Sequence, residues 1–206
     1  MQRQRVKSED DDQPPPAKKL RYFNDPTQSR ANRWDRIVIV EGQKFHVIAA
    51  HLAQHSDMFD GLFFGAFSEK DQKEVTLNDP VITAEDFQYF LEATNGELTI
   101  NDSNVNSVMH LADIWGATTV RKQCEKFLMM ETKKATKEKL EIAKQYGMDE
   151  LVKKTISEIK SMKEIIELVP DRKSLELLEK PMLEMLLTQA LRFPYPGCVL
   201  SNELMK

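Results

Sequence analysis

Residues 42–59 read GQKFHVIAAHLAQHSDMF, and the spacing of their apolar positions changes partway along the stretch. Phe45 and Val47 alternate with polar neighbours, as in a strand that has one buried face. From Ile48 onward the apolar residues recur every three or four positions, which is the spacing of an amphipathic helix. We therefore expect the chain to pass here from a β-hairpin directly into helices.

The residues on either side extend this pattern. A β-branched run precedes the turn signal at 41–42, so residues 36–47 are predicted to form the hairpin. Ser56 is a favourable N-cap and is expected to separate two short helices. A polar segment at 68–74 then leads to a short predicted strand at 75–77.

The remainder of the chain is predicted to be helical. Three amphipathic helices follow the strand: one capped by Thr83, one beginning near Asn101, and one with Cys124 on its apolar face. From Lys133 onward only helical patterns occur, and the final helix begins at Pro181. The residues of that helix expected in the core are Leu183, Leu186, Leu187, Ala190 and Leu191.

Composition excludes several classes of protein. The 206 residues carry a formal net charge of −4, which argues against a globally basic nucleic-acid-binding protein. No apolar run approaches the ~20 residues of a membrane-spanning helix, and no signal-peptide pattern is present. Two cysteines, Cys124 and Cys198, cannot build a disulfide framework. We therefore expect a cytoplasmic or nuclear location, with neither nucleic acid nor membrane as a partner.

No arrangement of reactive side chains predicts an enzyme. His51 and His55 have a spacing that can chelate zinc on one helix face, but Leu52 stands where the metalloprotease motif has Glu. Ordinary surface or core histidines are the preferred interpretation. Cys124 lies at a core position of its helix, where a small hydrophobic residue is expected rather than a nucleophile. We expect no catalytic residue, no metal site and no cofactor.

Residues 35–130 resemble the BTB/POZ domain. The features in common are an Asp before the first strand, a Phe that ends the hairpin and a Leu-Ala-x-x-Ser-x-x-Phe pattern, here Asp35, Phe45 and residues 52–59. Further matching residues are Leu62, Phe63, Val75, Leu77, Asp79, Phe87, Leu91, Leu111, Ala112, Asp113, Cys124, Glu125, Phe127 and Leu128. The resemblance implies an α+β fold of short strands with a helical cluster, and a role in protein–protein interaction.

The resemblance also suggests how the chain is divided. The N-terminus has an acidic run and three consecutive prolines with few apolar residues, so it is expected to be disordered. The helices that follow the BTB-like region resemble the BACK extension. The expected units are a tail at 1–33, the BTB/POZ domain at 34–131, an all-helical BACK-like extension at 132–193 and a tail at 194–206.

A docking motif is implied in the segment after the second helix. Many BTB proteins bind the cullin-3 scaffold of ubiquitin ligases there through a hydrophobic residue, any residue and then Glu, and this chain has Phe67, Ser68 and Glu69. An aromatic anchor supplies much of the affinity of such a patch, and a carboxylate can pair with a cation of the partner. The alternative is that Phe67 packs beneath its own loop and Glu69 is solvated.

A homodimer, the default of this family, is expected to involve Asp35, His51 and Leu52. His51 occupies a position where an aliphatic residue commonly meets the partner subunit. A titratable polar group weakens such a contact unless it is hydrogen-bonded. The chain also has Ile48-Ala49 in place of the usual His-Lys, and Asp57 in place of the usual Pro.

The primary hypothesis is a non-enzymatic, homodimeric adaptor that recruits an unknown protein substrate to a cullin-3 ubiquitin ligase. The alternative is a module that uses the BTB domain only to oligomerise in nuclear or transcription-associated assemblies. The basic stretch Lys18, Lys19 and Arg21 would then direct nuclear entry, although a solvated charged tail is the preferred interpretation. A Skp-like adaptor fits less well, because the helical extension is longer than such proteins need.

Overall fold

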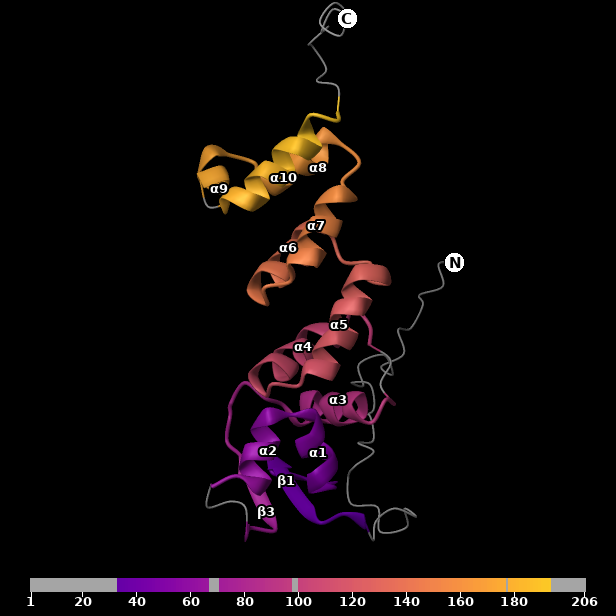
Figure 1. The fold of residues 1–206 in the computed structure, drawn as a ribbon, viewed down its shortest axis with the longest axis vertical. Coiled ribbons are helices and arrows are strands. Elements are labelled where there is room, and N and C mark those ends of the chain that lie inside the picture. Colours follow the sequence, from indigo (N-terminus) through magenta and orange to yellow (C-terminus); the bar gives the residue numbers. More distant parts are fainter. Residues whose placement is uncertain (1–32, 67–70, 98–99, 177, 194–206) are drawn as a thin grey trace, which may run out of the picture.

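The computed structural model describes residues 33–66, 71–97, 100–176 and 178–193. In these ranges the chain forms a small sheet followed by a column of helices (Figure 1). The elements are β1 (Arg36–Val40), β2 (Gln43–Val47), α1 (Ala49–His55), α2 (Asp57–Phe64), β3 (Glu74–Leu77), α3 (Ala84–Thr94), α4 (Val105–Ile114), α5 (Thr118–Met130), α6 (Thr136–Gln145), α7 (Asp149–Ser157), α8 (Met162–Leu168), α9 (Arg172–Glu176) and α10 (Lys180–Ala190). The predicted α+β fold is confirmed.

The sheet has three strands in the order β2-β1-β3. β1 pairs antiparallel with β2 and parallel with β3, so that Val38 lies opposite both Phe45 and Val75. All three side chains are buried, because alternate residues of each strand face the helices. This register confirms the hairpin that the alternating pattern predicted.

The hairpin turn also fixes the start of α3. Glu41 and Gly42 have φ of 48° and 75°, the left-handed pair that a tight two-residue hairpin turn needs. The Glu41 carboxylate then accepts a hydrogen bond from the Ala84 backbone N–H at 2.8 Å. A negative charge at a helix N-terminus is favourable, so the turn holds α3 against the sheet.

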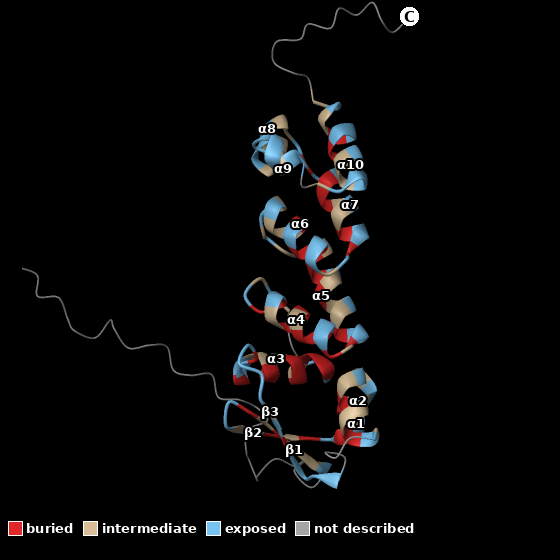
Figure 2. Cartoon of the chain, turned by 90° about the vertical axis from the view of Figure 1, so that its left-hand side faces the viewer, coloured by how far each residue is buried: buried red, intermediate tan, exposed pale blue. Residues whose placement is uncertain are grey.

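The hydrophobic core continues from the sheet into the extension (Figure 2). Near the sheet it is aromatic: Phe59, Phe87 and Phe90 surround Trp115, each meeting its ring edge to face. Edge-to-face contacts of this kind are a favourable aromatic geometry. The same core also contains residues of α6, α7 and their connection, namely Ile142, Ala143, Met148 and Leu151. The domain boundary at 131/132 stays a prediction, and the core runs across it.

A second, smaller cluster joins α10 to α6 and α7. Its buried members are Leu140, Ile156, Ile159 and Leu186. The buried Gln189 side chain of α10 donates hydrogen bonds to the carbonyl oxygens of Ile159 at 2.8 Å and Ser157 at 3.4 Å. These bonds satisfy carbonyls at the end of α7 that have no partner within the helix.

Two expectations from the sequence were wrong in detail, and one helix was missed. Leu187 and Leu191 are 60% and 81% exposed, because α10 turns a different face, with Leu186 and Gln189, toward α7. α4 begins at Val105 rather than near Asn101, since the Asn101 side chain accepts from the Ser103 N–H and forms a turn instead. The short helix α9 was not expected.

Candidate functional site

Ser56 anchors the start of α2, the helix that leads into the candidate docking segment. Its hydroxyl donates to the Trp115 carbonyl oxygen at 2.7 Å and accepts from the Phe59 N–H at 3.4 Å. Ser56 is buried, so both bonds are shielded from water. The predicted cap is confirmed, and it also ties α2 to the end of α4, a contact that local spacing does not indicate.

The aromatic residues at the end of α2 are divided between the core and the surface. Phe59 and Phe63 are buried and stack with ring centroids 5.6 Å apart. Phe64, one residue further around the helix, is 58% exposed. At Gly65 a Cβ atom would lie 2.3 Å from the Gly61 carbonyl oxygen, so a larger residue does not fit this close helix end. The chain therefore leaves α2 with an aromatic ring on the surface.

The three residues of the predicted docking motif, Phe67, Ser68 and Glu69, lie outside the described residues. The structure places the elements on either side of them, α2 and β3. The basic stretch Lys18, Lys19 and Arg21 likewise lies outside the described residues. Both assignments remain predictions.

The predicted dimer residues have clear places in the monomer. The Asp35 carboxylate accepts from the Ala49 N–H at 2.8 Å, which caps α1 because its N-cap residue Ile48 offers no side-chain acceptor. Leu52 is buried in the core of its own chain. Ile48 is exposed beside the cap. The structure therefore gives Asp35 and Leu52 roles within one chain, and the dimer contact itself stays a prediction.

His51 lies between the surface of α1 and the core. Its ring meets that of His55 with centroids 4.8 Å apart, and its Nε2 atom is buried without a hydrogen-bond partner in the described part of the chain. Burial and the nearby His55 lower the pKa of His51, while a hydrogen bond with the Thr94 backbone raises it in part. The ring is therefore neutral at pH 7, and its buried Nε2 faces away from solvent.

The described residues contain no group of three or more His, Cys, Asp or Glu side chains that could hold a metal ion. Cys124 is buried on α5, and desolvation raises the pKa of its thiol to about 12. A thiol with so high a pKa is almost entirely protonated at neutral pH, so it is a poor nucleophile. Cys198 lies outside the described residues.

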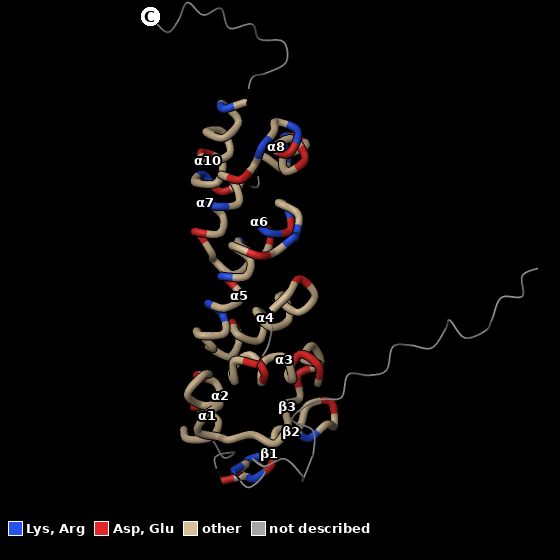
Figure 3. The backbone as a smooth tube through the Cα atoms, turned by 90° about the vertical axis from the view of Figure 1, so that its right-hand side faces the viewer, with Lys and Arg blue, Asp and Glu red and all other residues tan. Residues whose placement is uncertain are grey.

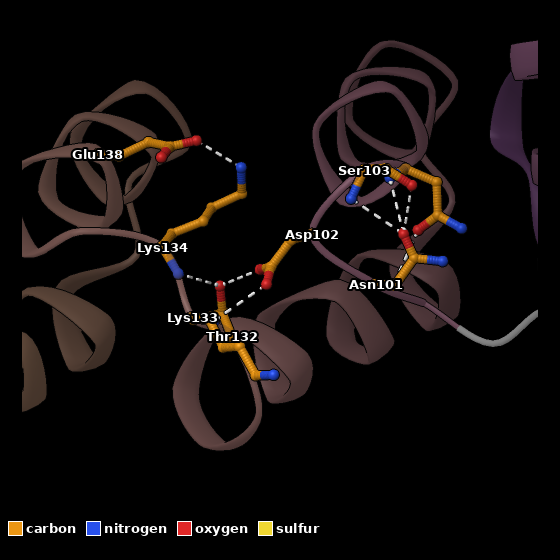
Figure 4. Close-up of polar contacts among 8 residues, drawn as sticks. Asn101, Asp102, Ser103, Thr132, Lys133, Lys134 and Glu138 are labelled. Atoms are coloured by element: carbon orange, nitrogen blue, oxygen red, sulfur yellow. Dashed lines mark hydrogen bonds and ion pairs between the residues drawn. The ribbon is translucent and has the colours of Figure 1, made fainter. Parts of the chain in front are cut away.

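A polar junction connects the turn before α4 to the linker between α5 and α6 (Figure 4). The Asp102 carboxylate accepts from the Thr132 hydroxyl and from the Lys133 N–H, the latter at 3.1 Å. These hydrogen bonds lower the pKa of Asp102, since they favour its ionised form. The Thr132 hydroxyl also accepts from the Lys134 N–H at 3.1 Å, and the Lys134 side chain, 9% exposed, pairs with Glu138.

A second junction holds the other end of α6. Arg121 on α5 donates to the Asp113 carboxylate of α4 at 2.7 Å and to the carbonyl oxygen of Tyr146, the C-cap of α6. Sequence reasoning missed both junctions. Asp102 and Thr132 are 30 residues apart. The polar residues at 101–103 indicated only a local helix start, so no sequence signal pointed to the contact.

Charge is distributed unevenly along the column (Figure 3). In the described part of residues 33–117, Asp and Glu outnumber Lys and Arg, whereas α5 and α6 carry more Lys and Arg than Asp and Glu. An acidic surface favours basic partners and slows association with acidic ones. None of the helices in the described ranges is long and apolar enough to cross a membrane.

The described residues thus form a small sheet capped by helices, with an exposed aromatic ring at the end of α2. The chain belongs to the BTB/POZ domain family, because residues 23–132, more than half of its length, match that family. Members of this family are typically interaction adaptors rather than enzymes.

Curated relatives with this domain come from Caenorhabditis elegans. BTB and MATH domain-containing protein 15 is 39% identical over 143 residues, which are 69% of this chain and 50% of the relative. BTB and MATH domain-containing protein 45 is 34% identical over 125 residues, covering 61% of this chain and 26% of the relative. BTB and MATH domain-containing protein 36 is 28% identical over 139 residues, covering 67% and 43%. The chain thus spans half or less of the length of these relatives.

Proposed function

We propose that this protein is a homodimeric adaptor that recruits a bound protein to a cullin-3 ubiquitin ligase. Membership of the BTB/POZ family supports the interaction role, and the exposed Phe64 is the observation that supports docking at this place. The segment with Phe67, Ser68 and Glu69 begins three residues after this ring. An apolar side chain next to the motif enlarges the patch that a partner would cover.

The helix period explains why Phe64 is available for such a contact. Phe63 points into the core beside Phe59, so the next residue is turned about 100° away, toward solvent. The Ser56 bond to Trp115 holds α2 on the domain, so the end of the helix is presented from a rigid base. Because the helix end is already ordered, less conformational entropy is lost when a partner binds.

The docking proposal is tested by capture of purified cullin-3 on the full chain. Phe67→Asp and Glu69→Lys are expected to abolish capture, because one removes the apolar anchor and the other reverses the charge. Asp71→Lys is the matched control: it places the same charge reversal on an exposed residue two positions beyond the motif and should leave capture intact. Unchanged capture by both motif variants, with circular dichroism showing a folded chain, would refute docking at this motif.

The homodimer is proposed to form around α1, with Asp35 and His51 near the contact and the buried Leu52 supporting the helix from within. Light scattering of the full chain gives the mass directly. A monomeric mass at every concentration would remove the dimer from the proposal. A dimer that does not capture cullin-3 would leave a self-associating scaffold as the function.

The location is proposed to be cytoplasmic or nuclear. The stretch Lys18, Lys19 and Arg21 is the candidate nuclear signal. A fluorescent fusion in which Lys18 and Lys19 are both replaced by Ala tests it. Loss of nuclear fluorescence would support the signal, and an unchanged distribution would reject it.

A further inference from the structure

Two side chains hold α6 near its ends: Asp102, in the turn before α4, and Arg121, on α5. Before α6 begins, the Asp102 carboxylate accepts hydrogen bonds from Thr132 and Lys133 in the linker (Figure 4). Where α6 ends, the Arg121 guanidinium donates to the Tyr146 carbonyl oxygen. One anchor lies in the linker just before α6 and the other at its C-cap, so the two together restrict rotation of the helix more than either does alone.

A series of hydrogen bonds and an ion pair connects Asp102 to the start of α6. The Thr132 hydroxyl donates to Asp102 and accepts from the Lys134 N–H, so it orders the linker on both sides. Lys134 is almost buried and pairs with Glu138 on α6. Each hydrogen bond in this series fixes the geometry of the next, because hydrogen bonds weaken steeply when they are bent.

Apolar packing and the polar junctions act together on this orientation. Ile142, Ala143, Met148 and Leu151 share the core of the BTB domain, and burying them keeps α6 and α7 close to α5. Interdigitated side chains restrict the angle between packed helices. The hydrogen bonds of Asp102 and Arg121 add directional restraints on the same angle.

We propose that Asp102 is a positioning residue that, together with Arg121, fixes the orientation of the helical extension on the BTB domain. The extension and the end of α2 then move as one body, so a protein bound to the extension is held at a constant distance from the docking segment. This functional consequence rests on the proposed adaptor role, whereas the orientation itself does not.

The test measures the distance between the two parts in the full chain. With Cys198→Ser as background, Gln54→Cys on α1 and Leu187→Cys on α10 provide two exposed positions for spin labels. Cys124 is buried and stays unlabelled. Pulsed electron paramagnetic resonance, with the labelled chain diluted in an excess of unlabelled chain, then gives the distribution of distances between the two labels of one chain. The parent is expected to give one narrow distribution.

Asp102→Ala and Thr132→Val are both expected to broaden that distribution, since each removes the same hydrogen bond. Asp102→Asn retains one acceptor oxygen, so its distance distribution should be narrower than that of Asp102→Ala. Asp79→Ala is the matched control: it also removes a carboxylate bonded to a backbone N–H, that of Val81 at 2.9 Å, but away from the junction. It should leave the distribution narrow.

The proposal is overturned if Thr132→Val gives a distribution as narrow as that of the parent and of Asp79→Ala. Thr132→Val decides the question even if Asp102→Ala fails to fold. Valine has nearly the same shape as threonine, so this variant is expected to fold. Cullin-3 is absent from this measurement. Failure of docking and failure of the positioning role are therefore distinguishable.

Discussion

His51 shows how a single residue can differ from what its sequence position indicates. The sequence places a polar, titratable group on the outer side of a short helix. In the fold, its Nε2 atom is buried without a partner among the described residues, and a second imidazole lies 4.8 Å away. Both features disfavour the protonated ring, which accounts for the lowered pKa of His51.

This lowered pKa predicts a loss of stability in mild acid. In the unfolded chain His51 has its ordinary pKa near 6.5, so below that pH the unfolded state binds the proton more readily than the folded state. The free energy of unfolding should therefore fall as the pH drops from about 6.5 to the pKa of the folded state. Urea unfolding at a series of pH values measures the slope of the free energy of unfolding against pH.

The slope should be smaller in His51→Leu, which has no titrating group at this position. His55→Gln is the comparison variant: it removes one cause of the lowered pKa of His51 but keeps the buried ring, so its loss of stability should lie between those of the parent and His51→Leu. If the parent and His51→Leu lose stability equally between pH 7 and pH 5, another group is responsible for the acid sensitivity.

Cys124 supplies a second prediction at the scale of one residue. Because burial raises its pKa to about 12, the thiol should resist alkylation by iodoacetamide at pH 8 in the folded chain with Cys198→Ser. In denaturing urea it should react fully. Mass spectrometry counts the added groups, and rapid labelling without urea would show that α5 opens readily.

At the scale of the element, the local pattern predicted where strands and helices lie, but it did not predict which of their apolar residues are exposed. The change of spacing after Val47 and the caps at Ser56 and Thr83 are local signals, and the structure has these elements as predicted. Leu187 and Leu191 have helical spacing too, yet both are exposed. Spacing shows that a helix has an apolar face, but only its neighbours decide which apolar residues are covered.

The two caps differ in a testable way. Ser56→Ala should lower the free energy of unfolding by about 2 kcal/mol, because it removes the cap of α2 and also leaves the buried Trp115 carbonyl unpaired. Thr83→Ala removes an exposed cap of α3 and should cost about 1 kcal/mol. Urea unfolding compares them. Equal losses would mean that the Trp115 bond adds nothing to stability.

At the scale of the whole molecule, the BTB domain and the first pair of extension helices form one packed body. The core that begins at Val38 in the sheet includes Leu151 on α7. Asp102 and Arg121 add polar contacts across the same boundary. The end of the BTB-like pattern near residue 131 therefore does not mark the end of the packed core.

Truncation tests this continuity. A chain ending at residue 131 loses the apolar residues of α6 and α7 that cover α5, so its urea midpoint should lie well below that of the full chain. A chain ending at residue 157 retains them and should unfold closer to the full chain. Equal midpoints for the chain ending at 131 and the full chain would show that the BTB domain is stable without the extension.

The sequence by itself determined the features that depend on neighbouring residues: the hairpin, the helices and their caps, and the order of residues that resembles the BTB/POZ domain. These follow from steric and hydrogen-bonding preferences that act within a few positions. Only the tertiary structure decided which leucines of α10 are covered, why the His51 ring is neutral, and that Asp102 holds a linker 30 residues away. Such contacts join segments far apart in the chain, and their energy depends on a geometry that exists only once the segments have packed together.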